Sequence, residues 1–336
     1  MPLAPYGVLK LDQRDPTKNI FTPMPNWPTG ADYRGLLEGW LGDISDFVWP
    51  NWSNGTWNGA ATATMEASTK FELELAVQEY QGGGDQVGIL SELPDVPPAQ
   101  DGQDRDQRWH YNVEDSLMIH PVFTEENLKE DAKSSFEFDV SRGFNANFTL
   151  YDPTFDNEKF TRLFLGQLSN LVPSIFDIKA HFQRPRPWTA SVGLNVSGFR
   201  WVTAYWQTHT GLHPSLLSGH CIQGILGGCS VLDALYSEGA TISDDRKRAI
   251  QKYMVDWGDR RVFAGVHYMS DNIGSWTLAR RLIPHLFQHS DEIDALLIEA
   301  LTQHSRVFKD IVRYFPAENT AKILLLQDFP EAVAGL

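Results

Sequence analysis

Apolar residues recur at helical spacing along most of this chain, and no segment of any length shows the apolar/polar alternation of a half-buried strand. The spacing is clearest between residues 156 and 180, where a long buried helix is expected, with a kink at Pro173. Further helices are predicted at 35–47, 67–80, 219–236, 243–257, 267–287 and 290–308. The sequence therefore predicts a mainly α fold.

The first third of the chain differs in composition from the rest. Residues 1–34 are rich in Pro, Asn, Asp and Gly with aromatic side chains spaced among them, which is typical of an irregular arm held to a larger body. A loop rich in Pro, Asp and Gly is expected at 92–110. We expect an aromatic-rich N-terminal extension over 1–110, with short helices and one long loop, packed on a helical bundle over 111–336.

Charge and hydropathy exclude several classes of partner. The 336 residues include 28 Lys and Arg against 43 Asp and Glu, which gives a net charge of −15. So acidic a chain is poorly suited to nucleic acid or to an anionic membrane, and attraction for an anion must be local to a pocket. No apolar run reaches the roughly 18 residues of a membrane helix, and the N-terminal residues do not resemble a secretory signal. A soluble protein is expected.

The cysteines and the glycosylation patterns bear on location. Cys221 and Cys229 are eight residues apart in a predicted helix, too far along its axis for a disulfide. This favours a reducing, cytoplasmic location over a secreted one, unless the chain is a mature form. Asn-x-Ser/Thr patterns, interpreted here as chance matches, begin at Asn51, Asn54, Asn147 and Asn195. None of these features indicates an oligomeric state.

One short stretch combines a cation, an imidazole and a carboxylate within an apolar segment. Arg261 is followed by His267 and then by Asp271. If the chain is helical from about His267, the histidine and the aspartate share one helix face. The carboxylate can then hold one ring nitrogen and leave the other to react. Arg261, on a short loop upstream, can bind an anion.

Two other stretches complete the groups that an oxyanion such as phosphate needs. Lys179 and Arg186 supply further cations, and Ser218, Gly219 and His220 supply a hydroxyl, an unobstructed backbone N–H and a second imidazole. The second group is expected at the N-terminus of a helix, where free N–H groups favour an anion. Because these cations can neutralise the anion by themselves, no metal ion is required.

In this order and spacing, the three stretches resemble the signatures of one superfamily. It contains the type 2 phosphatidate phosphatases, the bacterial non-specific acid phosphatases and the vanadium-dependent haloperoxidases. The signatures read here as Lys179-x6-Arg186-Pro187, Ser218-Gly219-His220 and Arg261-x5-His267-x3-Asp271. The resemblance covers residues 179–271 only. It implies a helical bundle of the acid phosphatase and vanadium haloperoxidase type, with 111–336 as the catalytic part.

The match has two departures and one ambiguity. Leu217 stands where the family has proline before the serine, and Arg260 stands where it has serine before the arginine. Arg184-Pro185 duplicates Arg186-Pro187 two residues earlier, and the family spacing from Lys179 selects Arg186.

The resemblance implies a phosphatase that acts on a phosphate monoester of a small molecule or of a lipid or prenyl group, without a cofactor. His267 would attack phosphorus to form a phosphohistidine, with Asp271 orienting its ring. His220 would protonate the leaving alkoxide and later activate water. The oxygens of the phosphate would be held by Lys179, Arg186, Arg261, the Ser218 hydroxyl and the Gly219 N–H.

Two alternatives stay open. In a haloperoxidase the same residues would hold vanadate, with His267 as its axial ligand, and bromide or iodide would be oxidised by hydrogen peroxide. The intervals of 32 residues from Arg186 to Ser218 and 43 from Ser218 to Arg261 are typical of the phosphatases. The segment from His213 to Ser215 resembles bromide-oxidising relatives instead, which makes His213 a candidate for a halide or substrate pocket. A non-enzymatic helical binding protein is the third alternative, and the complete charged set argues against it.

Overall fold

The structure is a computed structural model that describes residues 31–45, 52–53, 56–57, 63–80, 184–199, 214–263 and 265–333, together with positions 152, 154–156, 159, 175, 178–179 and 182. Most of these residues are helical, which confirms the predicted mainly α class. Within the described ranges the strands are limited to β1 (Trp52–Ser53) and β2 (Thr56–Trp57), which pair antiparallel.

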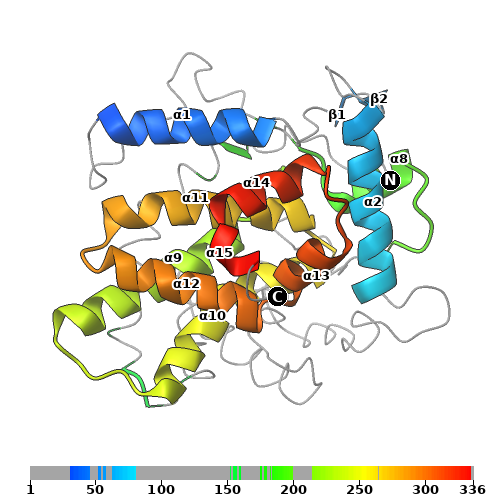
Figure 1. The fold of residues 1–336 in the computed structure, drawn as a ribbon. Helices are drawn as coiled ribbons and strands as arrows, with labels where there is room; N and C mark the ends of the chain where they lie inside the picture. The colour runs from blue at the N-terminus through cyan, green and yellow to red at the C-terminus, as the bar shows by residue number, and fades with distance from the viewer. Residues whose placement is uncertain are drawn as a thin grey trace, which may run out of the picture.

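Helix α9 (Gly219–Ser237) lies at the centre of the bundle, packed against α10 (Asp244–Phe263), α11 (Met269–Leu286) and α12 (Ser290–His304). Most of its residues are buried, because its sequence is apolar or small on nearly every face. Gly224 allows α10 to approach closely, since a Cβ there would lie 2.7 Å from the Cβ of Trp257. In Figure 1, the part of α9 that carries its label lies behind α12.

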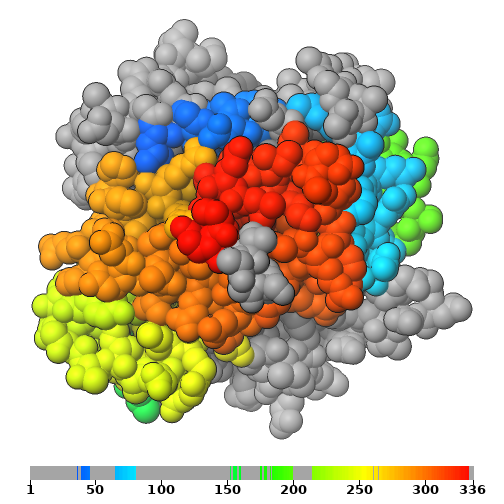
Figure 2. Space-filling view, in the orientation of Figure 1, coloured from blue at the N-terminus to red at the C-terminus, as the bar shows by residue number. Residues whose placement is uncertain are grey.

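The C-terminal residues form short helices that cover one face of the bundle. These are α13 (Arg306–Tyr314), α14 (Thr320–Asp328) and α15 (Pro330–Val333). In Figure 2, residues of α12 to α15 form the face toward the viewer, with α1 along the top and α2 along the right edge.

Two helices from the predicted extension pack on the bundle: α1 (Ala31–Ser45) on α11, and α2 (Ala63–Tyr80) beside α8 (Pro187–Gly193) (Figure 1). The indole N–H of the fully buried Trp40 donates to Thr277 Oγ1 at 3.0 Å, and Tyr80 Oη donates to Asp310 at 2.8 Å. The predicted boundary at residue 110 and the loop at 92–110 lie outside the described residues, so the division into two parts stays a prediction.

Several predicted helix ends are wrong. Helix α10 continues to Phe263 rather than ending near residue 257, so Arg261 lies in its last turn and not on a loop. Helix α11 begins at Met269, after His267. The helix predicted at 290–308 is divided at Ser305, whose hydroxyl accepts from the backbone N–H of Phe308 and so caps a new helix.

The long helix predicted at 156–180 is described at only a few positions. Lys159, Ile175, Ile178 and Lys179 are helical, and the positions between them lie outside the described residues. In the part of the chain that the structure describes, no helix has the length and apolar content needed to span a membrane.

Candidate active site

His267 lies in the turn between α10 and α11 rather than on a helix face. The backbone N–H groups of Val266 and His267 both donate to the carbonyl of Arg261, at 3.2 and 3.3 Å, and Gly265 adopts a positive φ of 69° within the turn. Asp271 lies in the first turn of α11 and accepts from the backbone N–H of Tyr268, the N-cap, at 3.1 Å. The predicted contact between His267 and Asp271 therefore exists, but a turn and a helix cap form it.

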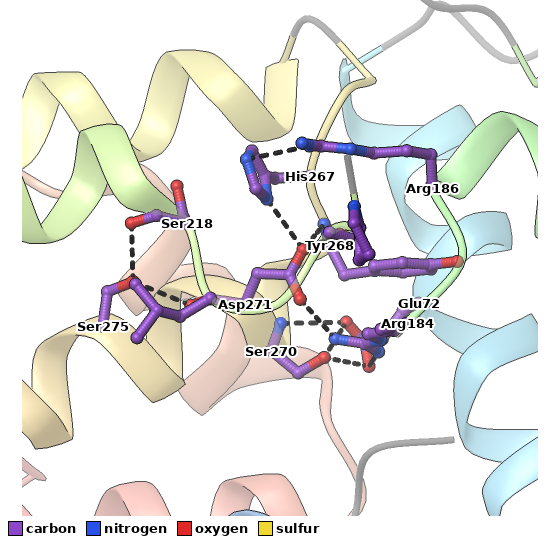
Figure 3. A network of polar contacts seen from close by, with 12 residues as sticks. Glu72, Arg184, Arg186, Ser218, His267, Tyr268, Ser270, Asp271 and Ser275 are labelled. Atoms are coloured by element: carbon purple, nitrogen blue, oxygen red, sulfur yellow. Dashed lines mark hydrogen bonds and ion pairs between the residues drawn. The ribbon is translucent and has the colours of Figure 1, made fainter. Parts of the chain in front are cut away.

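The two ring nitrogens of His267 have different partners, as Figure 3 shows. Nδ1 lies 2.8 Å from Asp271 Oδ2, and Nε2 lies 3.0 Å from a terminal nitrogen of Arg186. Because a guanidinium only donates, Nε2 must accept, which assigns the ring proton to Nδ1. Burial and the charge of Arg186 lower the pKa of His267 well below its ordinary value, although Asp271 opposes them. The imidazole is therefore neutral, with a lone pair on Nε2.

Three cations predicted to bind the anion are buried in this region. Arg186 also donates to the Val266 carbonyl at 2.7 Å, and its side chain is 1% exposed, as is that of Arg261. Burial lowers the pKa of Lys179 well below its ordinary value, and the positive charges of Arg186 and Arg261 lower it further. The negative charge of Asp271 opposes this shift. Repulsion by the two guanidiniums therefore adds to burial in destabilising the charged form of Lys179.

Lys179 is used differently from the prediction. Its ammonium donates to three carbonyls of one loop, those of Pro214, Ser215 and Leu217, at 3.0, 2.8 and 2.6 Å. An ammonium has three donors, so these contacts occupy all of them. Lys179 therefore fixes the loop that leads into Ser218, and its charge acts on the site through space.

Ser218, Gly219 and His220 begin α9, as predicted. Ser218 is the N-cap, but its hydroxyl makes no cap bond and is fully buried with no hydrogen-bond partner among the described residues. The backbone N–H of Ser218 lies 3.5 Å from the Asp271 carbonyl, which places this turn beside α11. His220 is 8% exposed and stacks on Trp257, with ring centroids 6.1 Å apart. His213 lies outside the described residues.

Sequence reasoning missed a second layer of polar side chains behind Asp271. Arg184 donates to Asp271 Oδ1 at 2.6 Å and stacks over the Tyr268 ring at 3.8 Å, and the Ser215 hydroxyl donates to Asp271 Oδ2. Burial alone would raise the pKa of Asp271, but Arg184 and the hydrogen bonds from His267 and Ser215 hold it below its ordinary value. In the sequence, the repeated Arg-Pro pair was the one feature that could have indicated this second layer. Arg186 contacts His267, and Arg184 contacts Asp271.

Glu72 completes this layer from α2. It accepts from the backbone N–H of Ser270 at 2.9 Å and from the Ser270 hydroxyl at 2.7 Å, and it lies 3.6 Å from Arg184 (Figure 3). Nothing in the sequence near residue 72 indicates these contacts, which join residues 198 apart.

The described residues of the site carry an excess of positive charge. Four cations, Lys179, Arg184, Arg186 and Arg261, accompany two carboxylates, Asp271 and Glu72, and all six side chains are at most 3% exposed. Asp271 and Glu72 both flank Arg184. Like charges kept from water are costly, and a bound anion of about two charges would relieve that cost.

No cluster of metal-ligating side chains occurs within the ranges that the structure describes. Comparisons of the chain with protein-family models, with curated proteins and with solved structures find no match. The site must therefore be interpreted from its own geometry.

Proposed function

We propose that this protein is a metal-independent phosphatase that hydrolyses a phosphate monoester through a phosphohistidine on His267. The observation that carries the proposal is the state of His267: a neutral imidazole whose Nε2 accepts from Arg186 within a buried group of cations, while Nδ1 is held by Asp271. An Nε2 lone pair beside fixed positive charge is what attack on a phosphate dianion requires. The bundle would then be of the acid phosphatase and vanadium haloperoxidase type.

The first half-reaction transfers the phosphoryl group to His267. Arg186 moves from Nε2 to a phosphate oxygen, Nε2 bonds to phosphorus, and the bond from phosphorus to the ester oxygen breaks on the opposite side. His220, in its protonated form, gives its proton to the leaving alkoxide. Asp271 stabilises the positive charge that develops on the His267 ring.

The second half-reaction returns the enzyme to its starting state. His220, now neutral, takes a proton from water as the water oxygen bonds to phosphorus and the bond to Nε2 breaks. Arg186, Arg261, the Ser218 hydroxyl and the Gly219 N–H bind the oxygens that gain charge. The Ser218 hydroxyl supports this role because it is buried, makes no cap bond and has no partner among the described residues. A small molecule or a lipid or prenyl group can carry the phosphate.

A vanadium haloperoxidase is the second candidate, because a neutral imidazole beside buried cations is equally suited to vanadate. His267 and the same cations would hold the vanadate, which would activate hydrogen peroxide for oxidation of bromide or iodide. Ser215 favours this reading, since it ends the segment that resembles bromide-oxidising relatives and donates to Asp271.

A side-by-side assay of the purified full chain decides between these functions. With a chelator present, we expect phosphate release from small organic monoesters and competitive inhibition by vanadate. His267→Ala should abolish release, whereas the matched His285→Ala should retain it because His285 is exposed near the end of α11. Bromide oxidation that needs vanadate and peroxide, without phosphate release, would select the haloperoxidase. Phosphate binding without either activity would select a binding protein.

A further inference from the structure

We propose that Glu72 of α2 is a positioning residue that strengthens the His267 nucleophile through Arg184 and Asp271. The inference rests on the proposed function only for its kinetic consequence. The effect of the Glu72 charge on the hydrogen bond between Asp271 and His267 can be measured in the protein without substrate.

The contacts form a continuous buried chain from α2 to the reacting nitrogen. Glu72 lies 3.6 Å from Arg184, Arg184 donates to Asp271 Oδ1 at 2.6 Å, and Asp271 Oδ2 lies 2.8 Å from His267 Nδ1. Glu72, Arg184 and Asp271 are 3%, 1% and 0% exposed, so water screens these interactions little. Figure 3 shows the four side chains in this order.

Burial raises the pKa of Glu72, whereas Arg184 and the two kinds of hydrogen bond from Ser270 oppose the rise and favour the ionised carboxylate. Arg184 is shared between Glu72 and Asp271, which limits how far it neutralises either one. If Glu72 lost its charge, Arg184 would interact with Asp271 alone and would neutralise it more completely. Asp271 would then attract the proton on His267 Nδ1 less strongly, and Nε2 would become less basic. The charge of Glu72 is therefore expected to make His267 the better nucleophile.

Glu72 also has a purely structural task that must be separated from this one. It accepts from the backbone N–H and the hydroxyl of Ser270 in the first turn of α11, and so supports the start of that helix. Glutamine at position 72 can keep a hydrogen bond to the Ser270 N–H while removing the charge. Ser270→Ala does the reverse, because it removes the hydroxyl contacts and keeps the charge.

The test compares Glu72→Gln, Ser270→Ala and a matched control, Glu74→Gln, which lies on the exposed side of the same helix. In the substrate-free protein, the NMR resonance of the His267 Nδ1 proton reports the strength of its bond to Asp271. We expect this resonance to move upfield in Glu72→Gln and to stay at the parent position in Glu74→Gln and Ser270→Ala. In the assay, kcat should fall about tenfold in Glu72→Gln with KM little changed.

A purely structural role gives a different pattern. Equal displacement of the resonance by Glu72→Gln and Ser270→Ala, or a parent-like resonance in Glu72→Gln with only a lower Tm, would overturn the proposal. If Glu72→Gln does not fold, the test rests on Ser270→Ala, which keeps the charge of Glu72. A displaced His267 resonance in Ser270→Ala would overturn the inference, and an unchanged one would support it. A parent protein without phosphatase activity would reject the proposed function and leave the resonance test intact.

Discussion

At the scale of single residues, the arginine beside His267 has two tasks that a lysine cannot combine. Arg186 donates to Val266 O at 2.7 Å and lies 3.0 Å from His267 Nε2 through the same terminal nitrogen. Its planar guanidinium holds five N–H donors in a fixed arrangement, which suits it to oxyanions. A lysine at this position would keep the positive charge but would lack the planar, fixed arrangement of N–H donors.

We therefore expect Arg186→Lys to weaken vanadate inhibition by about tenfold to a hundredfold, the cost of one lost charge-assisted hydrogen bond. The measurement is the vanadate inhibition constant in the phosphatase assay. Arg313→Lys is the matched control because Arg313 is exposed on α13. Inhibition constants for Arg186→Lys that equal those of the control would show that Arg186 does not bind the anion.

Residue types at fixed local spacing were predictable, whereas long-range contacts were not. His267 and Asp271 could be paired from the sequence because four residues separate them, although a helix cap rather than a helix face joins them. Arg184 could be noticed as a duplicate, but its bond to Asp271 spans 87 residues, and local spacing does not encode such a contact. The hydrogen bonds from Lys179 to three loop carbonyls were not predicted for the same reason, because they join residues 35 to 38 positions apart.

At the scale of helices, a buried carboxylate joins α10 to the start of α13. Asp259 accepts from the Ser305 hydroxyl and from the backbone N–H of Arg306, each at 2.7 Å, and from that of Val307 at 3.2 Å. Burial raises the pKa of Asp259 to about 7, although these hydrogen bonds oppose the shift. The folded protein therefore keeps a proton that the unfolded chain releases above its ordinary value of 3.8.

The contribution of Asp259 to stability should therefore decline as the pH rises from about 4 to about 7. Between pH 5 and pH 8, we expect the free energy of unfolding of the parent to fall by about 3 kcal/mol relative to Asp259→Asn, which cannot titrate. Urea unfolding of both proteins at the two pH values measures the difference. A constant difference would mean that Asp259 titrates at its ordinary pKa.

Helix interiors were easier to predict than helix ends. The predicted bounds 219–236 match those of α9 to within a residue, because apolar and small residues continue along the whole of this buried helix. Apolar residues at helical spacing continue across Ser305, so the spacing predicted one helix where the structure has α12 and α13. The division depends on a cap bond and on a carboxylate of another helix, Asp259. Helices α8, α14 and α15 were not predicted, because each has fewer than ten residues and shows little periodicity.

At the level of the whole molecule, the largest buried side chain that holds α1 on the bundle is that of Trp40, and the fully buried Ile44 packs beside it. Trp40 is fully buried, donates to Thr277 on α11, and lies 3.7 Å from where a Cβ at Gly274 would be. An ion pair of 2.7 Å between Arg281 and Asp43 links the same two helices at the surface. Burial of the indole is expected to dominate, because partly exposed ion pairs contribute little.

We expect Trp40→Ala to lower the free energy of unfolding by about 3–5 kcal/mol, through lost burial and the cavity left on α11. Ile323→Ala should change it by about 0.5 kcal/mol or less, since Ile323 is 39% exposed. Denaturant unfolding of the three proteins gives both values. Equal effects would indicate that α1 docks without depending on this contact.

The proposed function requires that distant segments of the chain, at residues 179, 186, 218 and 261–271, form one site in which His267 is the nucleophile. Rapid quenching into base during turnover, followed by mass spectrometry and ³¹P NMR, tests it directly. The prediction is a base-stable, acid-labile phosphoryl group on Nε2 of His267, absent from His267→Ala. Turnover without a phosphoenzyme, or with the phosphoryl group on another side chain, would contradict it.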